Sequence, residues 1–276
     1  MLKTLRTMSN EITTLIFRIL AGIATIGLVS SPAPLMIRIY KQKHVGVASA
    51  FPLAALLGSS HVWVIYGYLS SNYFPLVSCF LYGECCAIVF LAIYYFYSTD
   101  KSYVFRVLTA VVTIISIITL YAIVGTLGYT GQSPSIIETI MGLLADCGGF
   151  CLYGAPMEKV FQVLKHKSAV FINVHMVIAG LASNIFWLTY GTLIMNPFIM
   201  CLNGFFLIVN VFTLVLCLVY NPKKHPMKDW QDNGVEVSVC IERIDTSTPK
   251  ASFTRLPSPI QPPVMHDSVH LQHLAP

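Results

Sequence analysis

Seven long apolar stretches constrain this chain more than any other feature of its sequence. They run through residues 12–31, 46–70, 74–97, 103–127, 135–164, 170–195 and 197–220. An α-helix rises about 1.5 Å per residue, so about 20 apolar residues are needed to cross the hydrocarbon core of a bilayer. The links between the stretches are short. The sequence therefore predicts an all-α membrane protein with seven transmembrane helices.

Composition excludes the water-soluble alternatives. Only 11% of the 276 residues are charged and 55% are hydrophobic, whereas soluble domains carry about 25% charged residues. The net charge of +5 comes from a few basic residues in short loops, unlike the clustered basic surface that binds nucleic acid. We therefore expect no nucleic-acid partner. Residues 221–276 are polar and rich in proline, and are predicted to form a disordered tail.

The basic residues also predict the orientation of the chain. Eleven of them follow the first, third, fifth and seventh stretches, while the alternate links have none. Lysine and arginine accumulate in cytoplasmic loops. We therefore expect the N-terminal segment 1–11 to lie outside the cytosol, the tail 221–276 to be cytosolic, and the chain to be a multi-pass protein of the plasma membrane.

The second half of the chain repeats the first at an offset of 124 residues. The offset aligns Pro32 with Pro156, Lys41 with Lys165, Lys43 with Lys167, Ser59 with Ser183, Trp63 with Trp187, and Tyr66-Gly67 with Tyr190-Gly191. Each repeat holds three helices, and both repeats have their basic loop on the same side, so they are parallel and an extra helix must join them. The predicted layout is a first repeat (12–100), a linker helix (101–130) and a second repeat (131–220).

These residues resemble the SWEET family of sugar transporters. The resemblance rests on Ser31-Pro32-Ala33-Pro34 through Lys43, on Phe171 through Gly191, and on Asn196-Pro197-Phe198 through Gly204. It implies two parallel three-helix bundles joined by a linker helix, and bidirectional, facilitated movement of a mono- or disaccharide by alternating access. It implies a sugar substrate and a lipid bilayer as partners, no enzymatic activity, and no cofactor or metal. A homo-oligomer is compatible with it.

A sugar site needs aromatic surfaces for the C–H faces of the ring and neutral groups for its hydroxyls. Trp63 and Trp187 offer one such surface from each repeat. Ser59 and Ser183 precede them by four residues, which puts each serine on the same helix face as its tryptophan. We expect the four residues to clamp a sugar ring. The alternative is that the two indoles only pack between helices or lie at the membrane interface.

An asparagine in the seventh stretch extends this site. Asn203, followed by Gly204, matches the sugar-binding asparagine of the family. A buried amide in a membrane is costly unless it has a partner. The alternative partner is another helix. The offset places Cys79 at the equivalent point of the first repeat, and we expect the nearby Tyr82, followed by Gly83, to substitute for the missing asparagine.

Two gates follow from the resemblance. Pro32, Pro52 and Pro156 match three of the four prolines at the inner hinge of the family, and Asn173 occupies the fourth position. The alternative is that these prolines only end helices.

On the outer side, Tyr66 matches the gate tyrosine, and Asn196 replaces its acidic partner, so a Tyr66–Asn196 hydrogen bond is expected. Leu28 and Leu152, four residues before their prolines, match pocket-wall positions, and their bulk favours a monosaccharide.

Arg18, Glu84 and Asp146 are ionisable residues within the apolar stretches. An unpaired charge at the centre of a membrane helix costs about 2.5–3.5 kcal/mol, and such residues are often functional. Because Arg18 and Asp146 have similar depths relative to their prolines, we expect them to pair. His61 lies on a different face from Trp63, and we expect it to serve packing.

Three other functions compete with this interpretation. A proton-coupled carrier of the PQ-loop type would use Asp146 or Glu84, but neither repeat has the Pro-Gln pair of that group. A seven-helix receptor would share the outside N-terminus, but the Asp-Arg-Tyr and Asn-Pro-x-x-Tyr signatures are missing and receptors lack such a repeat. An intramembrane enzyme would need paired catalytic residues, which the sequence does not offer.

Overall fold

The computed structural model describes residues 2–46, 48–169 and 172–221, without the side chains of 2–9, 155 and 156. The predicted tail therefore lies outside the described residues, except for Asn221. The helices are α1 (Leu2–Ser30), α2 (Ala33–Gln42), α3 (Phe51–Leu69), the π-helix η1 (Tyr73–Val77), α4 (Ser78–Tyr97), α5 (Lys101–Thr126), α6 (Pro134–Leu152), α7 (Gly154–His166), α8 (Val174–Leu193) and α9 (Pro197–Val219). Every predicted apolar stretch falls on one or two of these helices.

Two of the predicted spans are broken helices. The first continues past its predicted end at Ser31 and consists of α1 and α2, which meet at Ser31 and Pro32. The fifth consists of α6 and α7, which meet at Tyr153. Proline has no backbone N–H and clashes with the preceding turn, so Pro32 starts a new helix at the N-cap of α2. Pro156 lies in the first turn of α7, and the break before it corresponds to the break before Pro32.

Six candidate membrane spans, including both broken helices, are long and apolar enough to cross a bilayer within the described part of the chain. The seventh predicted span is α3, which carries Ser59, Ser60 and His61 and is not among these six. It is also central, because it packs against α4, α5 and α6.

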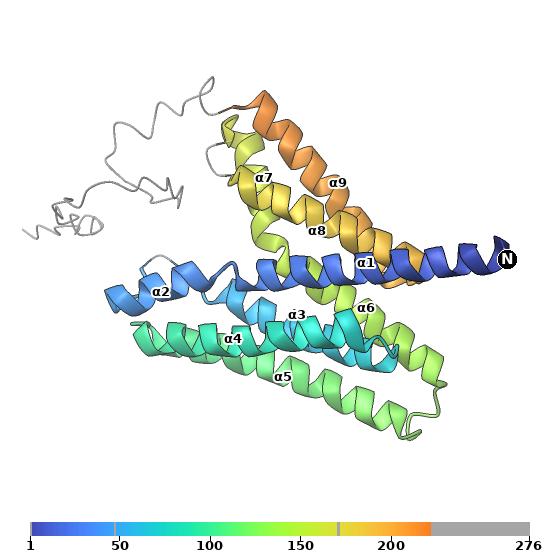
Figure 1. The fold of residues 1–276 in the computed structure, drawn as a ribbon. Helices are drawn as coiled ribbons and strands as arrows, with labels where there is room; N and C mark the ends of the chain where they lie inside the picture. The colour runs from blue at the N-terminus through green and yellow to red at the C-terminus, as the bar shows by residue number, and fades with distance from the viewer. Residues whose placement is uncertain (1, 47, 170–171, 222–276) are drawn as a thin grey trace, which may run out of the picture. The chain divides into compact units, whose positions relative to one another are not determined.

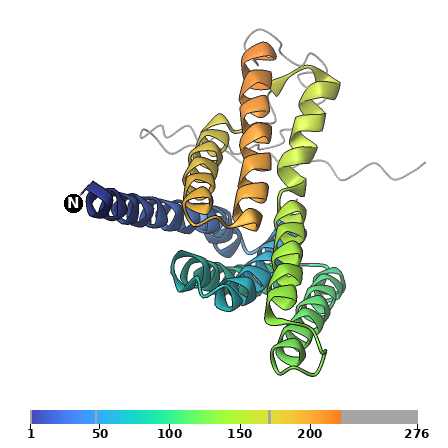
Figure 2. The same ribbon diagram turned by 90° about the vertical axis from the view of Figure 1, so that its right-hand side faces the viewer.

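The helices form two parallel bundles of three spans, joined by α5. In the first bundle α4 packs against both α1 and α3, and in the second α9 packs against both α6 and α8. The linker α5 contacts α3 and α6. The bundles meet through α1 against α8 and α3 against α6, so the first helix of each repeat packs against the second helix of the other. Figures 1 and 2 show α5 lying outside the two bundles. The predicted 3+1+3 layout is confirmed.

The repeat extends to the backbone conformation. Four described residues other than glycine have a positive φ: Lys43 (60°), Lys167 (51°), Ser71 (54°) and Met195 (55°). They form two pairs at the 124-residue offset. The first pair caps α2 and α7, and the second lies in the links before η1 and α9. Since a positive φ is uncommon for such residues, the shared turns indicate that both repeats build their helix ends in the same way.

The two ends of the bundles are packed differently. We call the end with Ser71 and Met195 the gate end, and the end with Lys43 and Lys167 the basic end. One buried core near the gate end contains residues of both bundles, including Trp63 and Trp187. Toward the basic end there are two cores, one around Met36 and α4 and the other around Val163 and α9. Figure 1 shows the bundles diverging toward α2 and α7. Within the described residues, the two bundles thus share one hydrophobic core at the gate end and have separate cores toward the basic end.

Candidate functional site

Two hydrogen bonds cross between the bundles at the gate end. Asn196 Nδ2 donates to the hydroxyl of Tyr66 over 2.6 Å, and the hydroxyl of Tyr190 donates to Asn72 Oδ1 over 3.1 Å. Both tyrosines are 1% exposed. The 124-residue offset relates Tyr66 to Tyr190 and Asn72 to Asn196. The expected Tyr66–Asn196 bond is therefore present, and it is one member of a symmetric pair that ties the bundles together.

The glycine after each gate tyrosine explains the repeated Tyr-Gly motif. A Cβ atom at Gly67 would lie 2.9 Å from the Cβ of Leu76, and one at Gly191 would lie 2.7 Å from Cγ2 of Ile199. Real Cβ atoms do not approach this closely, so any side chain there would separate the helices. The glycine allows the next helix to pack closely within its own bundle, while the tyrosine reaches the other bundle.

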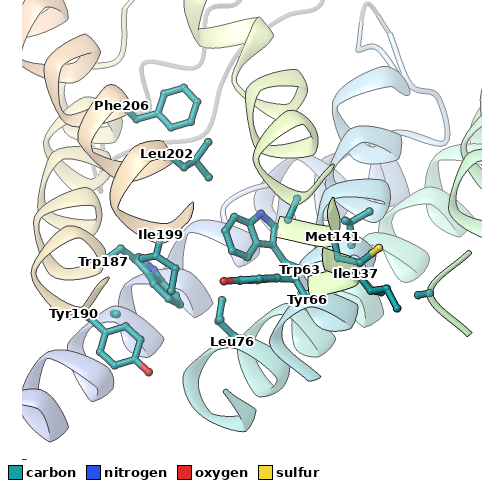
Figure 3. Close-up of a cluster of buried hydrophobic side chains, with 14 residues drawn as sticks. Trp63, Tyr66, Leu76, Ile137, Met141, Trp187, Tyr190, Ile199, Leu202 and Phe206 are labelled. Atoms are coloured by element: carbon teal, nitrogen blue, oxygen red, sulfur yellow. The ribbon is translucent and has the colours of Figure 1, made fainter. Parts of the chain in front are cut away.

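The two predicted tryptophans lie on the basic-end side of these bonds, in the core shared by the bundles. Figure 3 shows Trp63 and Tyr66 on one side and Trp187 and Tyr190 on the other. Both indoles also contact Phe80 of α4. Phe80 stacks on Trp63 at 5.5 Å and 16°, and it meets Trp187 at 6.1 Å and 41°. The indoles are therefore brought together with a third ring, which the sequence did not indicate.

The indole N–H groups of the two tryptophans differ. Trp187 Nε1 donates to Thr25 Oγ1 over 2.8 Å, and this hydroxyl donates in turn to the carbonyl oxygen of Ala21. The indole N–H of Trp63 donates to no residue that the structure describes. The offset relates Thr25 to Gly149, which has no hydroxyl. One indole is thus fixed to the opposite bundle, while the other keeps its donor free.

The smaller polar residues of the predicted site are also near the bundle interface. Ser59 and Ser183 are 4% and 3% exposed, and neither hydroxyl makes a hydrogen bond to a described residue. Ser59 lies against Gly148 of α6. Asn203 Nδ2 donates to the carbonyl oxygen of Ile199, in its own helix, over 2.8 Å. This bond satisfies part of the amide, and Oδ1 remains as an acceptor.

Tyr82, which we expect to replace the asparagine missing from the first repeat, does not lie beside the tryptophans. Tyr82 is 40% exposed, and its hydroxyl pairs with Ser30 of α1 over 2.8 Å. Cys79, its alternative by offset, is buried against Gly22. The residue of α4 that reaches the tryptophans is Phe80. Two residues correspond to about 200° around a helix, so Tyr82 faces away from them.

The predicted inner-hinge residues all lie at helix starts or breaks near the basic end. Pro32 and Pro156 follow the two breaks, and Pro52 occupies the first turn of α3. Asn173 caps α8, and its Oδ1 accepts from the backbone N–H groups of His175 and Met176. None of these prolines kinks the interior of a continuous helix. The side chain of Pro156 lies outside the described part.

The two predicted pocket-wall leucines lie beside the same breaks. Leu28 lies in the last turn of α1, and Leu152 is the last residue of α6. Leu152 packs against the core of the first bundle, although it belongs to the second. Both are half-buried.

The expected Arg18–Asp146 pair is absent from the described residues. The guanidinium of Arg18 lies 5.8 Å from the ring centroid of Tyr190, and its Nε is buried without a hydrogen bond. Asp146 is 7% exposed, and its Oδ1 also has no partner. A similar depth along two helices did not bring these groups together, because depth says nothing of the direction in which a side chain points.

His61 is not merely a packing residue. Its Nδ1 lies 2.9 Å from Glu84 Oε1, and its Nε2 lies 2.7 Å from Thr119 Oγ1. This network, which we call the His61 network, joins α3, α4 and α5. Its His61–Glu84 contact is the one pair of basic and acidic side chains within salt-bridge distance that is given for the described residues. Those residues include no cluster of three or more His, Cys, Asp or Glu that would suit a metal ion.

A cavity of about 750 Å³ opens at the gate end, beyond the crossing bonds. The gate pairs Tyr66–Asn196 and Tyr190–Asn72 line its floor, and Arg18 lines its wall. We call it the gate-end vestibule. The gate tyrosines and asparagines that line it lie between it and the tryptophans.

The sequence patterns did not single out three residues of this region, Asn72, Phe80 and Thr25. Asn72 could have been found, because the 124-residue offset aligns it with Asn196. Phe80 could not, because η1 lies between α3 and α4 and disturbs the register between the repeats. Thr25 had no signal beyond being a hydroxyl in an apolar helix.

The fold and these contacts define a membrane carrier made of two parallel three-helix repeats that meet around paired tryptophans. The family model described as "Sugar efflux transporter for intercellular exchange" matches residues 15–102 and 139–225. The second match begins 124 residues after the first, as the internal repeat does. The chain belongs to this family.

Individual relatives agree. The chain is 26% identical over 249 residues to the bidirectional sugar transporter SWEET7b of rice (Oryza sativa subsp. indica), covering 88% of this chain and 87% of the relative. It is 22% identical to the bidirectional sugar transporter SWEET5 of Arabidopsis thaliana, covering 78% and 88%. A solved eukaryotic SWEET transporter superposes with a TM-score of 0.68 at 17% identity, covering 76% of this chain and 98% of that one; this likeness concerns the fold.

Proposed function

We propose that this chain is a bidirectional facilitative sugar transporter, a uniporter that moves a mono- or disaccharide down its gradient by alternating access. The observation that carries the proposal is the pair of symmetric hydrogen bonds between Tyr66 and Asn196 and between Tyr190 and Asn72. They close one end of two bundles whose cores are separate at the other end. A carrier that opens to one side at a time needs this arrangement.

The sugar binds between the bundles at the tryptophans. The rings of Trp63 and Trp187 contact its C–H faces. The free indole N–H of Trp63 donates to a hydroxyl, and Oδ1 of Asn203 accepts from one. The hydroxyls of Ser59 and Ser183, which have no bond to a described residue, can do either. All these groups are neutral, as suits a neutral ligand.

Phe80 and the two wall leucines favour a small sugar. Phe80 covers one face of Trp63, so it takes surface that a second sugar ring would use. Leu28 and Leu152 add bulk beside the helix breaks. We expect Phe80→Ala to admit disaccharides, measured as a rise in the sucrose-to-glucose uptake ratio by a few fold, while Phe205→Ala, an exposed ring of α9, leaves the ratio unchanged.

Transport proceeds when the bundles rock against each other. The crossing bonds break when the gate end opens, and the segments at the helix breaks and starts, with Pro32, Pro52, Pro156 and Asn173, move together to close the basic end. Tyr66 and Asn196 thus serve as the outer gate. The basic end faces the cytosol and the N-terminus faces outside, in the plasma membrane, as the distribution of lysine and arginine predicts. A homo-oligomer stays a prediction.

Proton coupling is the second candidate. The buried carboxyl group of Asp146, whose Oδ1 has no partner, favours proton coupling. A uniporter, by contrast, carries no proton with the sugar. The experiment is uptake of a panel of radiolabelled sugars into proteoliposomes, with and without an imposed pH gradient. We expect the sugar to reach the same final level in both cases. Accumulation above the outside concentration, driven by the pH gradient, would establish coupling, and a lack of any sugar flux would remove the proposal.

A further inference from the structure

The gate-end vestibule has the size and the lining of a ligand site. Its volume of about 750 Å³ falls in the range of about 300–1,000 Å³ that is usual for small-molecule sites. Both bundles contribute to it. Besides the gate pairs, it is lined by the hydroxyl side chains of Ser70, Ser71, Ser135 and Thr139. It lies on the far side of the crossing bonds from the tryptophans, so it is separate from the proposed transport site.

Arg18 brings an unused hydrogen-bond donor to this vestibule. The guanidinium lies near the ring of Tyr190, and it forms no ion pair with any described residue. Its Nε is buried and has no hydrogen-bond partner. An arginine in an apolar helix is expensive to keep. Arg18 lines the cavity and makes no hydrogen bond to a described residue, which points to a ligand that accepts hydrogen bonds.

Glu138 brings an unused acceptor. It belongs to α6, in the other bundle, and it also lines the vestibule. Within the described residues its carboxylate makes no hydrogen bond or ion pair. Arg18 and Glu138 therefore share one cavity without neutralising each other directly.

A polyol fits this arrangement better than an ion does. Arginine can only donate hydrogen bonds, and an ionised carboxylate can only accept them, whereas each sugar hydroxyl does both. An anion would satisfy Arg18 but would be repelled by Glu138, and a cation would have the opposite difficulty. A neutral polyhydroxylated ring satisfies both groups at once.

We propose that the gate-end vestibule is a second, peripheral carbohydrate-binding site, in which Arg18 donates to and Glu138 accepts from hydroxyls of one monosaccharide. The inference rests on the proposed sugar transport, and it adds a binding step that precedes opening of the crossing bonds. Hydrogen bonds to charged groups are stronger than those between neutral groups, so two charged partners hold the sugar beside the closed gate.

The first test uses purified full-length protein in lipid nanodiscs, with D-glucose binding followed by saturation-transfer NMR. The variant Trp63→Ala/Trp187→Ala removes the proposed transport site. We expect it to keep a weak, saturable glucose signal, and we expect the addition of Glu138→Gln or Arg18→Gln to lower the apparent affinity about tenfold. The matched controls Glu11→Gln and Arg106→Gln, at exposed positions outside the vestibule, leave the signal unchanged.

Three results would overturn the inference. The first is no saturable signal in the double tryptophan variant. The second is a vestibule variant that binds like its control. The third is stronger binding of gluconate than of glucose, which would indicate an anion site at Arg18.

A second measurement covers the case in which the tryptophan variant fails to fold. In an otherwise unchanged chain, Ser135→Cys is alkylated by a membrane-impermeant maleimide, and glucose should slow the reaction unless Glu138→Gln is also present. No protection by glucose would refute the vestibule site.

The same proteins in proteoliposomes separate the two proposals. If sugar flux is normal but the vestibule variants bind like wild type, only the peripheral site is lost. If the unchanged chain gives no flux, sugar transport itself fails.

Discussion

The two repeats agree at the gate and differ at the tryptophans. At the gate, each repeat supplies one tyrosine and one asparagine, and both crossing bonds are present. At the tryptophans, Trp187 is bonded to Thr25 and Trp63 is not. The second repeat has Asn203 where the first has Cys79 and the neighbouring Phe80. The first repeat alone has the His61 network, because the counterpart of His61 is Ile185.

The gate contacts and the tryptophan contacts have different requirements. A gate between two similar bodies is closed most simply by equal contacts, so symmetry is kept there. A sugar has no twofold symmetry, so a site formed by two identical halves would leave some of its hydroxyls unpaired, which is costly in a buried place. The asymmetry at the tryptophans suits a sugar bound there, as we propose.

The largest expected effect tests whether the two tryptophans are both needed. Fully burying a large apolar side chain contributes about 1.5–3 kcal/mol, so losing the indole surface in Trp187→Ala or Trp63→Ala should reduce hexose uptake by about tenfold. Uptake is measured in cells that lack their own hexose carriers, with surface labelling to verify insertion. Uptake like that of wild type in either variant would remove the clamp from the proposal.

The His61 network gives the next largest effect and should act on stability alone. Glu84→Ala leaves His61 in an apolar place without its ion partner, and we expect a loss of about 2 kcal/mol in the free energy of unfolding. The double variant His61→Leu/Glu84→Leu should recover part of this loss. Thr119→Val is the matched control, since it removes one neutral bond. Thermal unfolding in detergent measures all three, and equal losses in the single and double variants would contradict the prediction.

The symmetry of the gate makes a paired prediction. Tyr66→Phe and Tyr190→Phe each remove one crossing bond, worth about 1 kcal/mol, so each should shift the balance toward the form that is open at the gate end by about fivefold. The shift is measured as faster alkylation of Ser183→Cys by an impermeant reagent from the gate side. The two variants should agree closely. A clear inequality between them would show that the crossing bonds are not equivalent in function.

The smallest effect concerns the fixed indole. Thr25→Val removes the acceptor for the Trp187 N–H, and we expect the KM for hexose to rise by about threefold. Thr25→Ser keeps the hydroxyl and should behave like wild type. Kinetics of uptake at several sugar concentrations decide the matter, and an unchanged KM for Thr25→Val would mean that packing alone orients the ring.

Much of the fold could be predicted from the sequence, because membrane spans appear as long apolar stretches and a repeat appears as matching residues at a fixed offset. The seven spans, the linker helix and the parallel layout all follow from apolar length and the 124-residue offset. The Tyr66–Asn196 bond was also predictable, because the family resemblance assigns Tyr66 and Asn196 to one gate. Its partner, Asn72 with Tyr190, follows from the same offset.

The errors concern the direction of side chains around a helix. Arg18 and Asp146 were paired by depth, and Tyr82 was chosen for its sequence neighbourhood, yet each points elsewhere. The partners of His61 come from two other helices, 23 and 58 residues away, and no local pattern reveals such a meeting. Where a helix faces depends on its packing, and η1 changes the register of α4 relative to α9.

The bond from Trp187 to Thr25 joins α8 to α1, so the ring proposed to hold the cargo is also attached to the opposite moving body. A tilt of one bundle therefore changes the position of the ring, and a sugar bound to the ring changes the energy needed to tilt the bundles. Loaded and empty carriers should accordingly turn over at different speeds, and exchange of sugar for sugar across the bilayer should outpace one-way emptying.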